Sequence, residues 1–308
     1  MNSIYKIYFL LPDFARFGYA GKAVNRLLEL LLVHTFKLIM PGYLQKSASQ
    51  AGFGLNQDAE RKEKYIISVT SFPARIEKIW ITLDCLLRQT FKPDKVILWL
   101  ANEQFPDKKL PDSLLRLQER GLEIKFCEDL KSHKKFYYTM LENPDANVIT
   151  FDDDVYYPNY ILEKLVETHK KFPEAVVANF AHKVVINNGK IANYMKWKHK
   201  FKAIKEPSHW LLQVGVGGVL YPSGKLYKDA FDKNLIFAVS PRSDDVWLKT
   251  QCYLNDTKIV TNNYFNKQLI TVRGTQKESL VSVNSHEGLK DIQIRQVMDH
   301  YKIDFSNC

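Results

Sequence analysis

From Tyr65 onward, short apolar runs alternate with stretches of helical periodicity. Four of the runs have the length and composition of buried strands: Tyr65–Ser71, Lys95–Leu100, Gly121–Cys127 and Asn147–Phe151. Helical stretches lie between them. Alternation at this spacing indicates βαβ units, in which neighbouring strands run parallel and helices cover the sheet.

The pattern becomes mixed beyond Phe172. Asn187-Asn188-Gly189 separates two short runs and predicts a β-hairpin, while Gln213–Tyr221 is Gly-rich and extended. Helices are expected at Asp244–Leu254 and Leu289–His300. We therefore predict an α/β fold in which a mostly parallel central sheet, flanked by helices, is followed by a mixed C-terminal half.

The first 64 residues differ from the rest of the chain. They hold two apolar-rich pieces, Ile4–Leu11 and Val24–Met40, followed by a linker-like stretch from Gly42 to Gln57. On a helical wheel, one narrow stripe is polar and mostly basic (Lys22, Arg26, Glu29 and Lys37), and the opposite side is largely apolar (Leu27, Leu28, Leu31, Thr35, Leu38 and Ile39).

This pattern predicts an amphipathic helix that ends at Pro41-Gly42. Such a helix either lies in a membrane interface or packs on the protein's own core, and the linker slightly favours the membrane. The expected organisation is an N-terminal membrane-associating segment with its linker at residues 1–64, and a main domain at residues 65–308.

The composition is that of an ordinary folded protein. Of 308 residues, 45% are hydrophobic and 25% are charged, which excludes disorder, collagen-like repeats and a coiled coil. No apolar stretch of about 18 residues predicts a membrane-spanning helix. The four cysteines, which form no CxxC pair, are Cys85, Cys127, Cys252 and Cys308. We therefore expect neither a zinc site nor a disulfide framework, and reduced thiols fit a cytosolic compartment best.

Three consecutive carboxylates follow the fourth predicted strand. Asp152, Asp153 and Asp154 stand at its carboxyl end, the edge at which open α/β sheets bind ligands. Adjacent negative charges repel one another, so a folded protein must solvate or neutralise them. A divalent cation does the latter, because hard cations take carboxylate oxygens. We favour a metal site here over an acidic surface loop.

A second acidic pair, Asp244 and Asp245, opens a predicted helix directly after Ser243. One interpretation is structural, because Ser is a good N-cap and acids are favourable in a first helical turn. The other is catalytic, with a carboxylate that takes a proton from an attacking hydroxyl group. The pair alone favours the structural interpretation.

Other segments give weaker signals. The glycines of Val214–Pro222 allow a backbone to approach a ligand closely, but a turn between strands explains them equally well. Lys134 and Lys135 precede a helix and suit a pyrophosphate, although a solvated helix start is the commoner explanation. His286 is typical of a surface residue.

Taken in order, five segments resemble a glycosyltransferase of the GT-A fold: Ile67–Ile76, Pro93–Leu100, Ile149–Pro158, Gly215–Pro222 and Ser243–Leu248. More narrowly, they are similar to family-2-like enzymes of bacterial capsule and lipopolysaccharide gene clusters. The resemblance implies a metal-dependent enzyme that transfers a sugar from a nucleotide-sugar donor to a glycan or glycolipid acceptor in surface polysaccharide biosynthesis.

The resemblance also implies roles for individual residues. Mn²⁺ or Mg²⁺ would be held by Asp152 and Asp154, with His286 as a further ligand, and would neutralise the departing nucleoside diphosphate. In inverting members, a carboxylate that corresponds to Asp244 or Asp245 deprotonates the acceptor. The implied donor-binding residues are Thr70, Ser71, Arg75, Lys134, Lys135, Asp152, Asp153, Gly217 and Gly218.

Two departures from the family pattern are visible. The Asp-Asp-Gly-Ser that usually follows the second strand is replaced by Ala101-Asn102-Glu103-Gln104, and the QxxRW motif of processive synthases is absent, which favours a non-processive enzyme. A nucleotidyltransferase is an alternative, but Ser71–Arg75 matches its Gly-rich loop poorly. A non-catalytic glycan- or membrane-binding protein is another, which the retained carboxylates disfavour.

The net charge of +10 is unevenly distributed. Residues 1–64 carry +4 and Lys183–Lys205, which has seven lysines and no acid, carries +7, so the remainder is close to neutral. The lysine-rich run fits an anionic membrane or acceptor and equally an edge strand. We expect peripheral contact with an anionic membrane, on the cytoplasmic face of the inner membrane, and no nucleic-acid partner.

Overall fold

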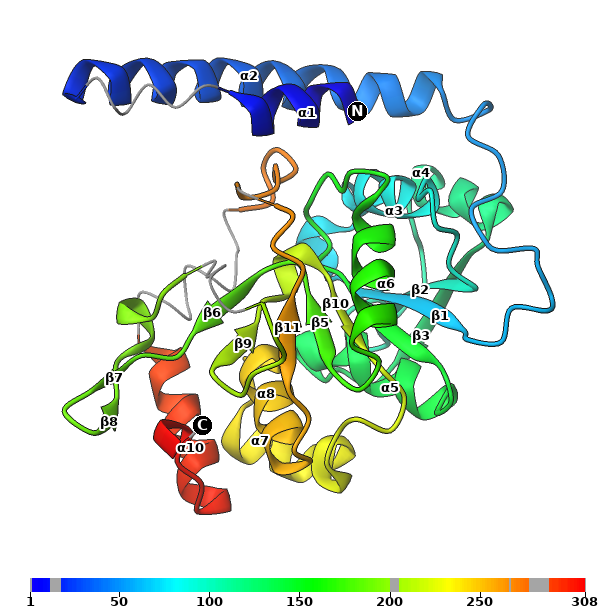
Figure 1. Cartoon of the computed structure of the whole chain (residues 1–308). Coiled ribbons are helices and arrows are strands. Elements are labelled where there is room, and N and C mark those ends of the chain that lie inside the picture. The colour runs from blue at the N-terminus through cyan, green and yellow to red at the C-terminus, as the bar shows by residue number, and fades with distance from the viewer. Residues whose placement is uncertain (1, 12–17, 200–204, 266, 277–287, 308) are drawn as a thin grey trace.

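The computed structural model describes residues 2–11, 18–199, 205–265, 267–276 and 288–307. Helices and strands alternate as expected in the first half of the main domain (Figure 1). The strands are β1 (Tyr65–Thr70), β2 (Lys95–Ala101), β3 (Leu122–Cys127), β4 (Asn147–Thr150), β5 (Val176–Ala178), β6 (Ala181–Lys183), β7 (Ile186–Asn187), β8 (Lys190–Ile191), β9 (Leu211–Gln213), β10 (Val219–Tyr221) and β11 (Ile259–Thr261).

The helices are α1 (Asn2–Leu10), α2 (Gly18–Lys46), α3 (Ile79–Leu87), α4 (Asp112–Leu115), α5 (Lys134–Glu142), α6 (Ile161–Lys171), α7 (Lys233–Val239), α8 (Asp244–Leu254) and α10 (Leu289–Tyr301). Short 3₁₀ turns join them: η2 (Pro73–Arg75), η3 (Arg116–Arg120), η4 (Lys131–His133), η5 (Tyr194–Lys196), η6 (Gly215–Gly217), η7 (Lys228–Phe231) and η8 (Phe305–Asn307).

Seven of the described strands form one sheet in the order β11-β5-β10-β4-β1-β2-β3. β1 pairs in parallel with both β4 and β2, and β2 pairs in parallel with β3. β10 runs antiparallel between β4 and β5, which makes the second half mixed. The predicted α/β architecture, with a mostly parallel sheet and a mixed C-terminal half, is confirmed.

Both faces of the sheet are buried. Tyr65, Ile67 and Val69 of β1 enter the core that contains residues of α3 and α6, whereas Ile66 points to the opposite face. Helix α5 packs on β1, β2 and β4. Two covered faces explain why the strands read as nearly continuous apolar runs instead of alternating ones.

The N-terminal helices share the core of the main domain. Tyr5, Phe36 and Met40 are buried in the same cluster as β1 and α3, although α1 and α2 form a separate bar across one end of the molecule (Figure 1). The prediction that Pro41-Gly42 ends the second helix is wrong, because α2 continues to Lys46. Met40 and Leu44 lie on one buried face, and their packing outweighs the backbone hydrogen bond lost at a proline.

The second half differs from the prediction in two places. Gln213–Tyr221 is not one extended segment, because η6 separates β9 from β10. The alternating strand expected around Lys196–Lys202 is replaced at its start by η5, which lets Tyr194 and Trp197 pack in the same core, and residues 200–204 lie outside the described part. The hairpin at Asn188-Gly189 is confirmed, and both residues have the positive φ that such a turn needs.

Gly218 gives a test of this architecture. Its φ is +83°, and a Cβ added there would lie 2.2 Å from Cε1 of Phe151, which precedes the acidic triplet. Gly218→Ala is expected to lose about 1–3 kcal/mol for a backbone conformation (φ +83°, ψ 142°) that only glycine adopts readily, and a further ~1–3 kcal/mol for overpacking. The free energy of unfolding in urea measures both contributions together.

Gly224→Ala is the matched control, because Gly224 has a φ of +68° and nothing within 4 Å of an added Cβ. It is expected to lose only the backbone contribution. Equal losses in the two variants would contradict the close packing of Gly218 on Phe151.

Candidate functional site

A pocket of about 720 Å³ lies at the carboxyl ends of β1 and β4. Because the two strands are parallel neighbours, the segments that follow them meet at one sheet edge. Many of the residues singled out in the sequence line this pocket: Thr70, Ser71, Arg75, Lys134, Lys135, Asp152, Asp153, Asp154, Asp244 and Asp245. His286 lies outside the described residues.

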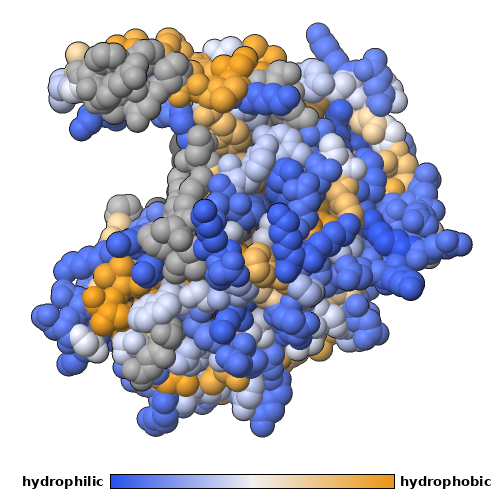
Figure 2. Space-filling model, in the orientation of Figure 1, coloured by the Kyte–Doolittle hydropathy of each residue, from blue (hydrophilic) through white to orange (hydrophobic). Residues whose placement is uncertain are grey.

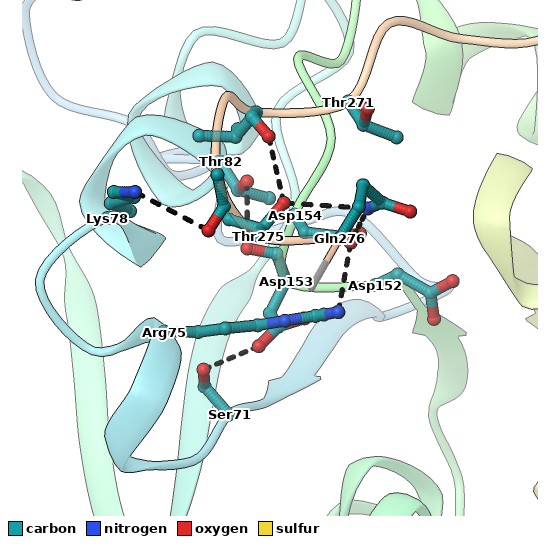
Figure 3. A network of polar contacts seen from close by, with 12 residues as sticks. Ser71, Arg75, Lys78, Thr82, Asp152, Asp153, Asp154, Thr271, Thr275 and Gln276 are labelled. Carbon is teal, nitrogen blue, oxygen red and sulfur yellow. Dashed lines mark hydrogen bonds and ion pairs between the residues drawn. The ribbon is translucent and has the colours of Figure 1, made fainter. Parts of the chain in front are cut away.

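Asp153 is tied to the segment after β1. Ser71 donates a hydrogen bond of 2.5 Å to its carboxylate, and Arg75 forms an ion pair with the same group (Figure 3). Thr82 of α3 also donates to the backbone carbonyl of Asp153, at 3.1 Å. Burial raises the pKa of Asp153 in spite of Arg75. These contacts make Asp153 the carboxylate that joins the acidic triplet to the Ser71–Arg75 segment.

Asp154 is held by the segment that precedes α10. Gln276 donates to its carboxylate at 2.5 Å, and Val272 donates its backbone N–H to the Asp154 carbonyl at 2.7 Å (Figure 3). Arg75 reaches the same carboxylate at 3.2 Å. Burial, followed by the neighbouring Asp153, raises the pKa of Asp154 to about 7. One guanidinium is shared between two carboxylates, so negative charge is in excess at this point.

Lys135 joins the two acidic motifs. Its ammonium group lies 2.9 Å from a carboxylate oxygen of Asp152 and 2.9 Å from one of Asp244. Burial alone would lower the pKa of Lys135, but the two carboxylates raise it well above its usual value. Burial would likewise raise the pKa of Asp244, but Lys135 lowers it below the usual value. Asp244 is therefore held as a carboxylate that positions Lys135.

Asp245 has a different environment. The ammonium group of Lys290 is 3.6 Å from its carboxylate, and Gln213 donates to its backbone carbonyl at 3.1 Å. Burial raises the pKa of Asp245, and the neighbouring Asp244 raises it further against the opposing effect of Lys290. The cap predicted at the start of this helix is present too, since Ser243 accepts from the N–H of Val246 at 3.4 Å. Of the pair, Asp245 is the better proton acceptor.

The glycine that approaches the charged groups is Gly215. A Cβ added there would lie 3.1 Å from both Asp152 Oδ1 and Lys135 Nζ, and 3.5 Å from Asp245 Oδ1. The predicted Gly217 and Gly218 face Phe180 and Phe151 instead, and they are absent from the described lining of the pocket. At these two positions the absence of a side chain is explained by packing, and a role of Gly217 and Gly218 in donor binding stays a prediction.

The two lysines predicted to hold a diphosphate are already paired. Lys134 forms an ion pair with Asp129, and Lys135 is buried between its two carboxylates. Several residues that line the pocket were not identified from the sequence, because they are isolated in polar or mixed segments: His182, Arg242, Gln276 and Lys290. Tyr194 and His199, which also line it, lie in the lysine-rich run Lys183–Lys205. The nearest available signal was the predicted helix that begins at Leu289, directly before Lys290.

The residues at the sheet edge fit a divalent cation. Asp152 and Asp154 bring hard oxygen donors to one pocket, and the pKa of Asp154 is raised by burial first and by the neighbouring Asp153 second, both of which a bound cation would offset. Among the described residues, no group of three or more His, Cys, Asp or Glu forms a complete cage. Two carboxylates that leave the remaining positions to water and phosphate oxygens are the usual arrangement for Mg²⁺.

Comparisons with known proteins give limited information. No protein-family model and no curated protein matches the chain. The chain is similar to a solved structure of CMP:2-keto-3-deoxy-manno-octonic acid synthetase complexed with CTP, with 12% identity and a TM-score of 0.40, over 73% of this chain and 100% of that chain. It is also similar to 4-diphosphocytidyl-2C-methyl-D-erythritol synthase, with 12% identity and a TM-score of 0.38, over 72% of this chain and 98% of that one. Because these TM-scores are low, we infer the chemistry of the site from the residues of this chain and not from the two similar structures.

His133 makes folding depend on pH at the edge of this site. Its Nε2 lies 2.8 Å from the Ser240 carbonyl, and burial lowers the pKa of His133 to about 4. Between pH 6.5 and 4 the unfolded chain binds a proton that the folded chain does not. The stability that His133 contributes is therefore complete above pH 6.5 and lost as the pH falls towards 4, by up to about 3 kcal/mol.

His133→Gln keeps a donor for Ser240 without a titrating ring. Compared with His300→Gln, at an exposed position of α10, it is expected to flatten the pH dependence of the unfolding free energy between pH 6.5 and 4. Urea denaturation at several pH values measures the unfolding free energy of each variant. The difference between the two variants removes the contribution of the carboxylates, because both variants contain them. Parallel curves for the two variants would contradict a neutral, buried His133.

Proposed function

We propose that this protein is a metal-dependent, non-processive glycosyltransferase that moves a sugar from a nucleotide-sugar donor to a glycan or lipid-linked acceptor in surface polysaccharide biosynthesis. The observation that carries the proposal is a pocket with two acidic groups of different character. Asp152 and Asp154 stand at the sheet edge, and Asp245, with its raised pKa, stands beside Asp152 at Gly215. A ligand between them meets a cation-binding edge and a proton acceptor.

The size and lining of the pocket suit a nucleotide sugar. Its volume of about 720 Å³ is within the range of small-molecule sites. Phe72, which contacts the Arg75 guanidinium at 5.3 Å, offers an aromatic ring beside Thr70 and Ser71, where the resemblance places the nucleoside. Tyr194 and His199 line the pocket and meet edge to face, with ring centroids 5.2 Å apart, and aromatic rings of this kind suit contact with sugar rings.

The charge of the inner cluster favours a cation beside a bound diphosphate. Two acidic motifs contribute Asp152, Asp153, Asp154, Asp244 and Asp245, whereas the basic groups paired with them are Arg75, Lys135 and Lys290. Carboxylates outnumber these paired cations, which favours a bound metal ion at the sheet edge. Lys131, Lys134 and Arg242 also line the pocket and offer positive charge to a diphosphate. Mn²⁺ or Mg²⁺ on Asp152 and Asp154 would supply Lewis-acid stabilisation of the leaving diphosphate.

Asp245 is the proposed general base. The acceptor oxygen forms a bond to the anomeric carbon, the bond from that carbon to the diphosphate oxygen breaks, and the hydroxyl proton passes to Asp245. Burial raises the pKa of Asp245, which makes it a better base than an ordinary aspartate, and Lys290 keeps it ionisable. Lys135 and Asp244 act as positioning residues for Asp152.

The donor and the metal are tested with a panel of nucleotide sugars, assayed for release of nucleoside diphosphate with and without Mn²⁺. Asp154→Asn is expected to lower turnover by about 10²-fold or more, because it removes a charge that holds the cation. Asp299→Asn, at an exposed position of α10, is the matched control and should retain wild-type turnover.

Two outcomes would overturn the proposed function. Turnover that survives both EDTA and Asp154→Asn would exclude the metal site. Release of pyrophosphate from a nucleoside triphosphate and a sugar, with no turnover of nucleotide sugars, would instead identify a nucleotidyltransferase.

The base is tested by comparing Asp245→Asn with Asp244→Asn. Asp245→Asn is expected to lower kcat by about 10²–10⁴-fold while donor affinity changes little, because the proton acceptor acts only in the chemical step. Asp244→Asn should instead weaken donor binding, because Lys135 loses a carboxylate that positions it beside Asp152.

The pH profile gives an independent readout of the same base. Because the pKa of Asp245 is raised, the acid limb of kcat should lie above the value of about 4 that is usual for aspartate. A kcat that is independent of pH down to 4, or a full kcat in Asp245→Asn, would rule this residue out as the base.

A further inference from the structure

Helix α2 turns its apolar side away from the protein. Four of its large aliphatic side chains are more than half exposed: Leu27 (57%), Leu31 (58%), Leu38 (53%) and Ile39 (55%). Leu28 is 37% exposed, and Leu30, on the flank of this side, is 60% exposed. Figure 2 shows hydrophobic residues gathered on the bar formed by the N-terminal helices, whereas the rest of this face is mostly hydrophilic. A helix packed on its own core would show the opposite orientation.

Two members of the polar stripe of α2, Glu29 and Lys37, contact the main domain. Glu29 forms an ion pair with Lys267 at 2.6 Å, and Lys37 donates to the Thr271 hydroxyl at 3.3 Å. Phe36 and Met40, which lie beside this stripe, are buried. Glu29 and Lys37 are thus used for docking inside the molecule, whereas Lys22 and Arg26 of the same stripe stay exposed, and the apolar side has no protein partner in the described part of the chain.

Helix α1 extends the same exposed surface. Tyr5 and Tyr8 point inward, where Tyr5 accepts from the Ile270 N–H at 3.1 Å and Tyr8 donates to the Gln268 carbonyl at 3.1 Å. Ile7 and Leu10 are 55% and 77% exposed. Exposed apolar residues that are contiguous over two helices indicate an interaction surface, whereas single ones do not.

By length and composition, helix α2 could cross a bilayer, and it is the single such helix among the described residues. Of its most apolar 18-residue window, 17% is buried inside the protein. Its contacts indicate that it lies along the surface instead. The main domain packs on it from Glu29 to Leu44, about 22 Å of helix, and a spanning orientation would carry those hydrophilic parts of the domain into the hydrocarbon.

The charges at the edges of this surface select an anionic partner. Lys6, Lys22, Arg26 and Lys46 are exposed on the two helices. Glu29, the acid in the described part of these helices, is neutralised by Lys267. An apolar face with a basic border is the pattern of helices that lie in the headgroup region of anionic bilayers.

We propose that the outward side of α1 and α2 is a docking surface for an anionic lipid bilayer, and that this contact holds the mouth of the pocket next to the membrane. Gln268 and Thr271, which contact Tyr8 and Lys37, both line the pocket. The bilayer contact stands independently of the proposed function. The class of acceptor does rest on the proposed function, because a pocket mouth held next to the bilayer favours a lipid-linked acceptor in the same membrane.

The experiment is flotation of the full-length protein with vesicles of phosphatidylcholine and phosphatidylglycerol. Wild-type protein should float with these vesicles and much less with phosphatidylcholine alone. Leu31→Glu combined with Leu38→Glu should lower vesicle binding about tenfold or more, because two charges would enter the hydrocarbon boundary. Leu141→Glu, on the 49% exposed Leu141 of α5, is the matched control and should bind like wild type.

The double variant leaves the inward contacts of α2 intact, so release of nucleoside diphosphate from a soluble donor should stay at the wild-type level. Unchanged flotation of the double variant would overturn the membrane proposal. A wild-type dimer in sedimentation equilibrium that becomes a monomer in the double variant, with no vesicle binding by either, would identify a second copy as the occupant instead. If the wild-type protein floats with the vesicles but turns over no nucleotide sugar, the proposed function is overturned and the membrane contact stands.

Discussion

The ion pairs of Lys135 connect the two halves of the site. Its ammonium group comes from the start of α5, Asp152 follows the parallel strand β4, and Asp244 begins α8 of the mixed half. A buried lysine without a carboxylate partner would be strongly destabilising, and so would the two carboxylates without it. The separation between a paired Asp244 and a protonatable Asp245 follows from this arrangement, as does the close approach of Gly215. The chemistry proposed for the pocket depends on that separation.

The local part of this architecture could be predicted from the sequence. Strand–helix alternation determines the parallel half, and parallel pairing of β1 with β4 brings Ser71 and Asp153 to one edge. The roles of Asp244 and Asp245 could not be separated in the same way. Their difference arises from Lys135 and Lys290, which belong to α5 and α10, and no periodicity relates those helices to α8. The choice between Gly215 and Gly217 likewise depends on the ring of Phe180, which is distant in sequence.

The amphipathic helix shows a different kind of ambiguity. Periodicity identified the polar and apolar sides of α2 but not which of them would face the domain. That direction is set by contacts from distant segments, namely the ion pair of Glu29 with Lys267 and the hydrogen bond of Lys37 to Thr271. The effect of Pro41 was also non-local, because burial of Met40 and Leu44 on either side of it keeps the helix continuous.

The hydroxyl group of Tyr5 has a consequence for how the main domain can be isolated. It donates to the carbonyl of Tyr156 and accepts from the N–H of Ile270, and Phe36 covers the Tyr156 ring at 5.1 Å. A recombinant fragment that begins at Tyr65 would leave both backbone groups without this partner, one of them at Tyr156, two residues beyond Asp154, and would expose the Tyr156 ring to water. Poor solubility and a disturbed acidic triplet would then arise together, so the N-terminal helices complete the core of the main domain.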